Sequence, residues 1–450
     1  MLPSSTISHV GRCFFQKTIG LLVVILQLPF VLVTSFILSS YGAYMLARAV
    51  ISDFSNEFEQ PCSTQSMNPS IPPIVLVHGV LGFGEEKMGR LSNFTGVEKK
   101  YEKIFVPDLG SFTSIYDRQR NFLEYRARQL FYYLKGGQVD YGEEHSRACG
   151  HSQYGRVYKQ AGAQVVRVLQ QMLADKAFKG HANTSGNWVA SLTSLCGAFN
   201  GSTKAYIMGM KPEDWSRVKP ISVLQICCLG IILYDWLDIS WMKSYYNFGF
   251  DHFNISWRKT GVRGLVDCLL GNAGPFASGD WVLPDTTIPG SMHINSQLTT
   301  FPNTFYFSYT AKLTKRVRGF IVPTSIPEMN PWFFFEVFLM SLWRYPTDLP
   351  PPYEGDEDWW DNDGVLNTIS MTHPSLPNEH PHQLVADELN LQPRPGIWCY
   401  KTMEAYHSQF LTNAGTEGNQ FSQLYDTVFK RCRQLVIKKS PVMVLQDEDD

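Results

Sequence analysis

The sequence has 450 residues, of which 44% are hydrophobic, 14% aromatic and 18% charged, and its formal net charge is −2. This length allows one large domain or two to three smaller ones, and the low charge with many aromatic residues excludes a largely disordered chain. The near-neutral balance argues against a nucleic-acid-binding protein, which usually presents a basic stripe. The nine cysteines are irregularly spaced and form no CxxC pair, so neither a zinc ribbon nor a thioredoxin-like motif is predicted.

The first part of the chain, residues 1–51, is predicted to be a membrane anchor. Ile19 to Leu38 contains no charged residue and has the length that a helix needs to cross a bilayer. A cleaved signal peptide and a buried core helix are the alternatives, but the run is longer than a usual signal core and no clear cleavage site follows it. Arg12 and Lys17 before the run, against Arg48 after it, place the amino terminus in the cytoplasm. We therefore expect a single-pass membrane protein whose main domain is lumenal or extracellular.

The rest of the chain divides into a linker, one large domain and a tail. Residues 52–72 are polar and rich in proline and serine, residues 73–436 form the predicted domain, and residues 437–450 are an acidic tail. The apolar run 73–77 must be buried on both faces, as in the interior of a parallel sheet. Further strands are expected at 103–108, 188–195 and 303–309, helices at 121–135 and 163–173, and a core helix or lid at 221–237. Strands that alternate with helices predict an α/β fold with a mostly parallel sheet.

A glycine-rich loop follows the first predicted strand. It reads His78-Gly-Val-Leu-Gly-Phe-Gly84, and its glycines allow the backbone to approach a substrate closely. In α/β-hydrolases a loop at this position supplies one amide of the oxyanion hole. A phosphate-binding loop is not expected, because no Gly-Lys-Ser/Thr follows. An ordinary glycine turn is the alternative.

Two single residues near the carboxyl end could form an acid and base pair. Asp363 lies in an Asn-Asp-Gly sequence at an expected strand end, where a carboxylate can orient a histidine. His407 follows it, which is the chain order of acid and then base in α/β-hydrolases. Taken alone, the first motif is more typical of a turn, and a single histidine is more often structural.

Four further residues are candidate zinc ligands. Neutral imidazoles and carboxylates can form a tetrahedral zinc site. Histidines on the surface are the alternative interpretation. The four candidates are Asp117, His145, His151 and Asp251.

Several longer motifs together resemble one family. They are PIVLVHGVLGFG, VDYGEEH followed by GH, FPNTFYFSY and DNDGVLNTISM, and they occur between about residues 70 and 435. In this respect the chain is similar to the large bacterial lipases of the staphylococcal and thermophilic-bacillus type, which carry zinc and calcium, and to their plant homologues. The resemblance implies an α/β-hydrolase fold and hydrolysis of lipid carboxylesters. It also implies that segment 221–237 is the lid.

The resemblance also assigns roles to single residues. It implies that Asp363 is the catalytic acid, His407 the catalytic histidine, and the amides of Val80 and Ala161 the oxyanion donors. It implies that the four candidate ligands above hold a structural zinc ion that fixes an extra subdomain to the core.

The chain departs from this family at the nucleophile. No G-x-S-x-G occurs, and Gln160 stands before Ala161, where the serine is expected. A core strand and its turn, about 15–20 residues, are missing there, and we hypothesise that residues 156–159 replace this strand in the sheet. Ser152 has the wrong spacing to the next glycine to be the nucleophile. Calcium is not predicted, because Tyr406 and Gln409 replace the family's acidic residues.

The sequence therefore predicts a lipase-like carboxylester hydrolase that lacks its nucleophile and is inactive as written. Its expected partners are a lipid or ester substrate and a membrane, with no nucleic acid. The first alternative is a non-catalytic lipid-binding or scaffolding protein on a hydrolase frame. The second is a membrane structural protein without a lipid pocket.

Overall fold

The structure is a computed structural model. It describes only part of the chain, and the statements below concern this part. The described residues are 72–80, 82, 94, 96–97, 101, 103–110, 112–114, 116–117, 122–123, 125–158, 166–318, 320–324, 331–345, 355–375, 380–386, 388, 391–412 and 418–439.

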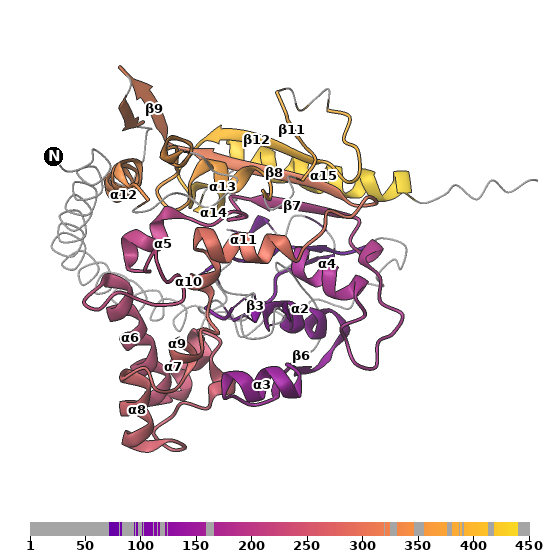
Figure 1. The fold of residues 1–450 in the computed structure, drawn as a ribbon. Coiled ribbons are helices and arrows are strands. Elements are labelled where there is room, and N and C mark those ends of the chain that lie inside the picture. The colour runs from indigo at the N-terminus through magenta and orange to yellow at the C-terminus, as the bar shows by residue number, and fades with distance from the viewer. Residues whose placement is uncertain are drawn as a thin grey trace, which may run out of the picture.

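The centre of the structure is a four-stranded parallel sheet with the strand order β11-β12-β8-β7 (Figure 1). Strand β8 (Phe305–Lys312) is almost wholly buried, and its aromatic and small residues fill both faces of the sheet. It pairs with β7 (Ser191–Leu195) on one side and with β12 (Trp398–Glu404) on the other, while β11 (His382–Leu384) forms the edge. Burial on both faces explains the continuous apolar runs of these strands.

Shorter strand pairs surround this sheet. Strands β1 (Ile74–Val75) and β2 (Ile104–Phe105) pair in parallel, with Ile74 opposite Ile104. Three other pairs are antiparallel: β3 (Tyr116–Asp117) with β4 (Phe122–Leu123), β5 (Gly137–Asp140) with β6 (Tyr154–Tyr158), and β9 (Thr314–Val317) with β10 (Phe320–Pro323).

Helices cover the sheet on both sides and form separate apolar clusters. Helix α15 (Gln420–Lys439) contacts β7, and its buried Phe421 and Phe429 pack in a cluster with Tyr309 of β8. Helices α2 (Tyr125–Lys135) and α4 (Val166–Ala174) pack on each other in a second cluster. The strands and helices thus alternate along the chain, and the predicted α/β architecture is confirmed.

Of the remaining helices, those between residues 203 and 342 are drawn in magenta to orange in Figure 1. Most of them pack in the largest apolar cluster, whose fully buried residues include Met210, Trp281 and Ile288. The full set of remaining helices is α3 (Glu143–Cys149), α5 (Thr203–Met208), α6 (Val223–Leu237), α7 (Ser240–Tyr245), α8 (Gly261–Leu269), α9 (Pro275–Ser278), α10 (Val282–Asp285), α11 (Ile288–Ser296), α12 (Pro331–Leu342), α13 (Thr368–Thr372) and α14 (Gln409–Thr412), with short 3₁₀ turns η3 (Gly186–Trp188), η4 (Asp251–Phe253) and η5 (Asp356–Trp359).

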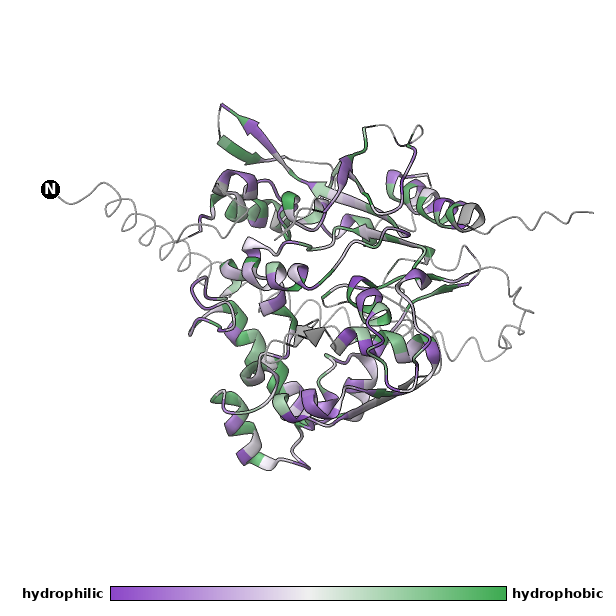
Figure 2. Ribbon diagram, turned by 45° about the vertical axis from the view of Figure 1, so that its right-hand side comes forward, coloured by the Kyte–Doolittle hydropathy of each residue, from purple (hydrophilic) through white to green (hydrophobic). Residues whose placement is uncertain are grey.

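Helix α6 begins and ends almost where the sequence predicts. Ser222 caps its start by accepting a hydrogen bond from the Gln225 amide. Its sequence is apolar nearly all round, so it buries one face against the cluster and leaves Leu229 and Leu233 exposed on the other. Apolar residues dominate α6 in Figure 2, whereas α8 alternates apolar and polar residues.

Two expectations about the architecture are wrong. Strand β6 pairs antiparallel with β5 in a sheet of its own, so the hypothesis that residues 156–159 replace a strand of the central sheet is contradicted. The prediction of a single-pass membrane protein with a lumenal or extracellular domain is also contradicted. Within the described ranges, no helix combines the length and the apolar character that crossing a bilayer requires. The predicted span, residues 19–38, lies outside the described residues.

Candidate active site and metal centre

Asp363 and His407 come together beside the carboxyl ends of two neighbouring parallel strands. His407 follows β12 after a short turn, and Asp363 lies between η5 and α13, a helix that packs against both β8 and β12. The Nδ1 atom of His407 lies 2.8 Å from Oδ2 of Asp363, and the His407 amide donates to the Asp363 carbonyl at 3.2 Å. Two hydrogen bonds between the same two residues fix the orientation of the imidazole ring.

The carboxylate of Asp363 is fully buried and held by backbone amides. Its Oδ1 atom accepts hydrogen bonds from the amides of Val365 at 2.9 Å and Leu366 at 2.7 Å. Amide donors of this kind stabilise a carboxylate that has left water. The other oxygen remains available to His407, so the residue can orient a histidine in the way that the sequence predicts.

The local sequence explains why this turn forms. The Asn362 side chain accepts a hydrogen bond from the Gly364 amide at 2.9 Å, which closes the turn around Asp363. Gly364 has a φ of +92°, and a Cβ atom there would lie 3.0 Å from the ring of Phe333. Glycine is therefore required at this position both for the backbone angle and for the close contact.

Burial alone would lower the pKa of His407, but the charge of Asp363 and its hydrogen bond outweigh that effect, so the pKa is raised. The side chain of His407 is 29% exposed, whereas that of Asp363 is fully enclosed. The arrangement thus favours an imidazole that accepts a proton beside this carboxylate.

Cys196 is a neighbour of this pair that the sequence does not reveal. It directly follows β7, and its sulfur, an Asp363 oxygen and a His407 nitrogen all lie within 4.8 Å of one another. Burial and the charge of Asp363 raise the pKa of the Cys196 thiol well above its ordinary value. The thiol is therefore neutral, and a neutral buried thiol is a poor nucleophile.

The described start of the glycine-rich loop, residues 78–80, is fixed by His78. This side chain is buried, its Nε2 accepts a hydrogen bond from the Leu109 amide at 3.3 Å, and Arg126 donates to its carbonyl at 3.1 Å. Burial, together with the charge of Arg126, lowers the pKa of His78 to about 3, so the ring is neutral. Val80 lies in the turn that follows. Ala161, the second expected oxyanion donor, lies outside the described residues.

A second cluster of polar side chains lies in the core near α3. The Nε2 atoms of His145, His151 and His252 lie 3.8, 3.6 and 3.8 Å from Oδ2 of Asp280. None of these four side chains is more than 3% exposed. The structure thus brings together two of the predicted zinc ligands with two residues that the sequence prediction missed.

The other predicted metal-site residues lie elsewhere or outside the description. Asp251 begins η4 with its carboxylate exposed, and both of its oxygens accept hydrogen bonds from Nδ2 of Asn247. Asp117 lies in β3, and its side chain is outside the described part of the structure. Ser152, which the sequence rejects as nucleophile, accepts a hydrogen bond from the Asn254 side chain at 2.8 Å.

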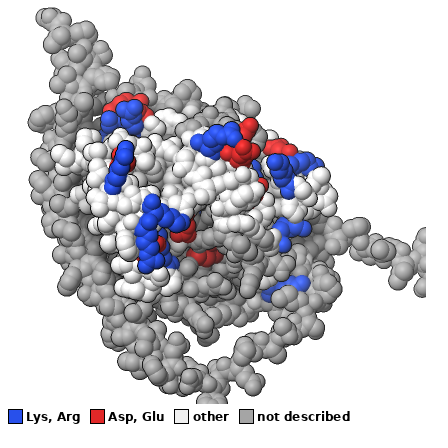
Figure 3. Space-filling view, turned by 90° about the horizontal axis from the view of Figure 1, so that it is seen from below, with Lys and Arg blue, Asp and Glu red and all other residues white. Residues whose placement is uncertain are grey.

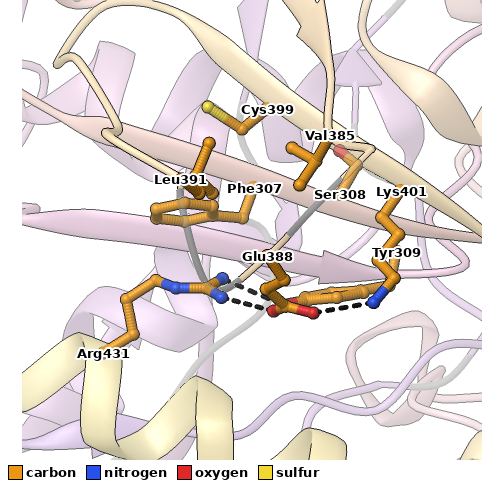
Figure 4. Close-up of a pocket in the computed structure, with 9 residues that line it drawn as sticks. All are labelled: Phe307, Ser308, Tyr309, Val385, Glu388, Leu391, Cys399, Lys401 and Arg431. Atoms are coloured by element: carbon orange, nitrogen blue, oxygen red, sulfur yellow. Dashed lines mark hydrogen bonds and ion pairs between the residues drawn. The ribbon is translucent and has the colours of Figure 1, made fainter.

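A small cavity lies beside the central sheet, and neither member of the Asp363–His407 pair lines it (Figure 4). Its main polar group is Glu388, which pairs with Arg431 of α15, with Lys401 of β12 at 2.9 Å and with the Tyr309 hydroxyl. Burial would raise the pKa of Glu388, but these hydrogen bonds lower it. The ionised, fully paired carboxylate ties its loop to the sheet and to α15, which is a structural function.

Comparison with known proteins points in the same direction as this geometry. A family model described as "Lipase-like, C-terminal domain" matches residues 70–166. The lipase of Staphylococcus hyicus is 27% identical over 391 residues, covering 77% of this chain and 55% of that protein. Lipase 2 of Staphylococcus aureus is 26% identical over 374 residues, with 73% and 48% covered. The chain thus spans about half the length of these relatives.

Solved structures give the same result for the fold. The crystal structure of Staphylococcus hyicus lipase superposes with a TM-score of 0.60 at 24% identity, covering 82% of this chain and 96% of that one. EstA from Clostridium botulinum superposes with a TM-score of 0.57 at 24% identity, covering 79% and 86%. The chain is therefore similar to staphylococcal-type lipases over most of its length and shares their fold.

Proposed function

We propose that this chain is built as a lipase-type carboxylester hydrolase, with esters of lipids as its substrate class. The observation that carries the proposal is the buried Asp363 carboxylate, which holds His407 through Nδ1 at 2.8 Å. Because Nδ1 is engaged, Nε2 of the imidazole is the atom that exchanges protons with a nucleophile and a leaving alcohol. The similarity to lipases supports the same substrate class.

The residues of this chain would have the following roles in ester hydrolysis. His407 accepts a proton as a nucleophile attacks the ester carbonyl and then donates it to the departing alkoxide. Asp363 remains ionised and stabilises the imidazolium that forms between these steps. The amides of Val80 and Ala161 are proposed to hold the oxyanion, because such donors act where negative charge develops.

We also propose that the chain as written does not carry out this reaction at the rate of a lipase. It contains no G-x-S-x-G, and the residue before Ala161 is Gln160, whose amide is not nucleophilic. A triad hydrolase without its serine retains only roughly 10³–10⁴-fold catalysis over water from binding and the oxyanion hole. Cys196 lies next to His407, but its raised pKa disfavours the thiolate that a replacement nucleophile would need.

Reaction of the full chain with a fluorophosphonate probe, together with hydrolysis of p-nitrophenyl butyrate, tests this proposal. We expect no covalent labelling and a rate within about threefold of the His407→Ala variant. A second chain, with a G-x-S-x-G strand–turn segment inserted between Tyr158 and Ala161, is expected to gain both labelling and His407-dependent turnover. Labelling of the unmodified chain would disprove the missing nucleophile, and an inserted chain that folds but stays inert would disprove the hydrolase design.

The rival function is non-catalytic binding of lipid, and the exposed apolar faces of α6 and α8 favour it. Ile226, Leu229 and Leu233 of α6 are exposed, and α8, which packs on α6, exposes Val262 and Val266. The described surface in Figure 3 carries only scattered charged groups. If α6 is the lid that the sequence resemblance implies, this surface contacts lipid in either function. The chain with the inserted G-x-S-x-G segment separates the two, because only a hydrolase frame gains labelling and His407-dependent turnover from the insertion.

We propose, finally, that the chain holds a structural zinc ion at the cluster that contains His145 and His151. The donors fit, because buried imidazole Nε2 atoms converge on a buried carboxylate. The ion would link α3 to the helices that pack beside it, and no step of ester hydrolysis passes through it.

A further inference from the structure

We propose that the β9–β10 hairpin binds the surface of a membrane that contains anionic phospholipid. The contact residues are Lys315, Val317, Arg318 and Phe320, which we call the hairpin tip. This inference goes beyond ester hydrolysis and does not depend on it. It is also separate from the lipid contact through α6, because it concerns the charge of the lipid headgroup.

The strand register sorts the hairpin side chains into two faces. Directly paired residues of an antiparallel hairpin share a face, and successive residues along a strand alternate between the faces. Val317 pairs with Phe320 and Lys315 pairs with Val322, so these four side chains lie together on one face, the outer face. The inner face carries the two other pairs, which are Arg316–Ile321 and Thr314–Pro323.

The inner face is held by the rest of the molecule. Ile321 is buried, and β10 packs against α12. The Thr314 hydroxyl donates a hydrogen bond to Oδ1 of Asp361 at 2.5 Å, and Arg316 forms an ion pair with Glu357 of η5 at 3.7 Å. These contacts fix the orientation of the hairpin. Its outer face is therefore left to solvent, on an element that projects from the body of the molecule (Figure 1).

The outer face exposes an apolar pair to water. The side chains of Phe320 and Val317 are 75% and 43% exposed. Their transfer from water into an apolar environment is favourable. Two side chains are too few for a stable protein interface, which buries roughly 800 Å² on each partner. A bilayer, in contrast, accepts apolar side chains at the boundary between its headgroups and its acyl chains.

Two cations flank this apolar pair. Lys315 lies on the outer face and Arg318 in the turn, and both are exposed. Among the described residues neither forms an ion pair, whereas Arg316 on the inner face pairs with Glu357. Each basic residue close to an anionic lipid surface strengthens binding by about fivefold. Because the whole chain carries a net charge of −2, this attraction belongs to the hairpin tip and not to the total charge.

The same cations argue against another protein strand as the bound partner. Within the described structure, β9 pairs only with β10, and a strand edge of this kind can pair with a second chain. Lysine and arginine on an edge strand oppose such pairing, and β9 carries Lys315 and Arg316 with Arg318 directly after it. An anionic bilayer surface is the partner that suits both the apolar pair and the charges.

Co-sedimentation of the full chain with lipid vesicles tests the proposal. We expect at least about tenfold tighter binding to vesicles of phosphatidylcholine with phosphatidylserine than to phosphatidylcholine alone, and salt should reduce this difference. Val317→Ser with Phe320→Ser should weaken binding to the mixed vesicles by about tenfold or more, because the apolar pair is lost. Circular dichroism should remain unchanged, because both side chains are exposed.

A second double variant tests the charges alone. Lys315→Gln with Arg318→Asn should weaken binding to the mixed vesicles by about tenfold or more and leave binding to phosphatidylcholine unchanged. Asparagine is chosen at position 318 because the backbone φ there is +51°, which asparagine tolerates. Lys179→Gln with Arg394→Asn is the matched control, since it removes the same charge from two exposed positions outside the hairpin. This control should bind within about threefold of wild type.

Hydrogen exchange locates the contact. Mixed vesicles should slow the exchange of amides in 315–321 and leave those of β11 unchanged. Equal wild-type binding to both kinds of vesicle, binding that survives both hairpin variants, or an equal loss in the control would each overturn the proposal. A lipid-free dimer that Val317→Ser with Phe320→Ser abolishes would also overturn it, because the tip would then bind a second copy of the chain. A failure of the hydrolase proposal is recorded separately by the fluorophosphonate experiment.

Discussion

A single carboxylate decides the protonation of the candidate catalytic histidine. Burial pulls the pKa of His407 down, and only Asp363 pulls it up. We therefore predict that Asp363→Asn, which retains an acceptor for the amides of Val365 and Leu366, moves the His407 pKa from above its ordinary value of 6.5 to below it. NMR titration of the imidazole measures this shift. Asp361→Asn, which removes a partner of Lys312, is the matched control and should leave the His407 pKa unchanged.

The same shift sets the sign of the pH dependence of stability. A histidine whose pKa is higher in the folded than in the unfolded chain adds stability that is complete below the unfolded pKa and is lost as pH rises through the folded pKa. The destabilisation by Asp363→Asn should therefore be larger at about pH 5.5 than at about pH 8.5. Urea unfolding at both values tests this; an equal loss at the two pH values would show that Asp363 acts only through its backbone hydrogen bonds.

At the scale of single elements, α6 is the helix whose composition conflicts most with its position. It is apolar nearly all round yet leaves Leu229 and Leu233 36% and 46% exposed. If this face meets lipid, Leu229→Ser with Leu233→Ser should weaken partition into phosphatidylcholine vesicles by about tenfold or more, because each leucine loses roughly 1.5–3 kcal/mol of burial. Vesicle flotation measures the partition.

The control for this prediction lies on another element. Leu384 is 63% exposed and belongs to β11, the edge strand, which is drawn far from α6 in Figure 1. Leu384→Ser should leave vesicle partition unchanged. Equal losses in both variants would mean that the protein binds lipid through nonspecific apolar contact, and no loss in either would remove α6 as a lipid-binding element.

The sequence predicts those elements whose signal is local. Segment 221–237 forms α6, and segment 303–309 forms most of β8. A long apolar run with a helix cap, or a run of β-prone aromatic residues, can be recognised without knowing which distant residues it contacts. Residues 156–159 fail this test. They are β-prone, but the described strand β6 pairs antiparallel with β5, with Gly137 opposite Tyr158 and Gln138 opposite Val157, and not with the central sheet. Propensity identifies a strand without identifying its sheet.

The candidate sites show the same division at the scale of the whole molecule. Asp363 and His407 are predictable because chain order and a turn motif single them out, and the structure joins them. His252 and Asp280 escape prediction because only the fold brings residues 145, 151, 252 and 280 together. Their position has a consequence for the whole chain, since the cluster joins segments that are distant in sequence: α3, η4 and the α9–α10 connection.

A bound ion would therefore act as a cross-link of the fold. An ion that binds only the folded chain stabilises it by RT ln(1 + [L]/Kd), about 4 kcal/mol at a free concentration 1,000 times Kd. We predict that chelation lowers the thermal midpoint of the wild-type chain, that added zinc restores it in a concentration-dependent manner, and that His145→Ala abolishes this response. Hydrogen exchange should then locate the loosened region. Faster exchange is expected in 137–151 and 247–285, with the amides of β8 and β12 unchanged, because the central sheet carries its own core. An equal increase in the exchange rates of the β8 amides would show that the two regions unfold together. Exchange rates that do not change on chelation would show that the cluster stabilises the fold without an ion.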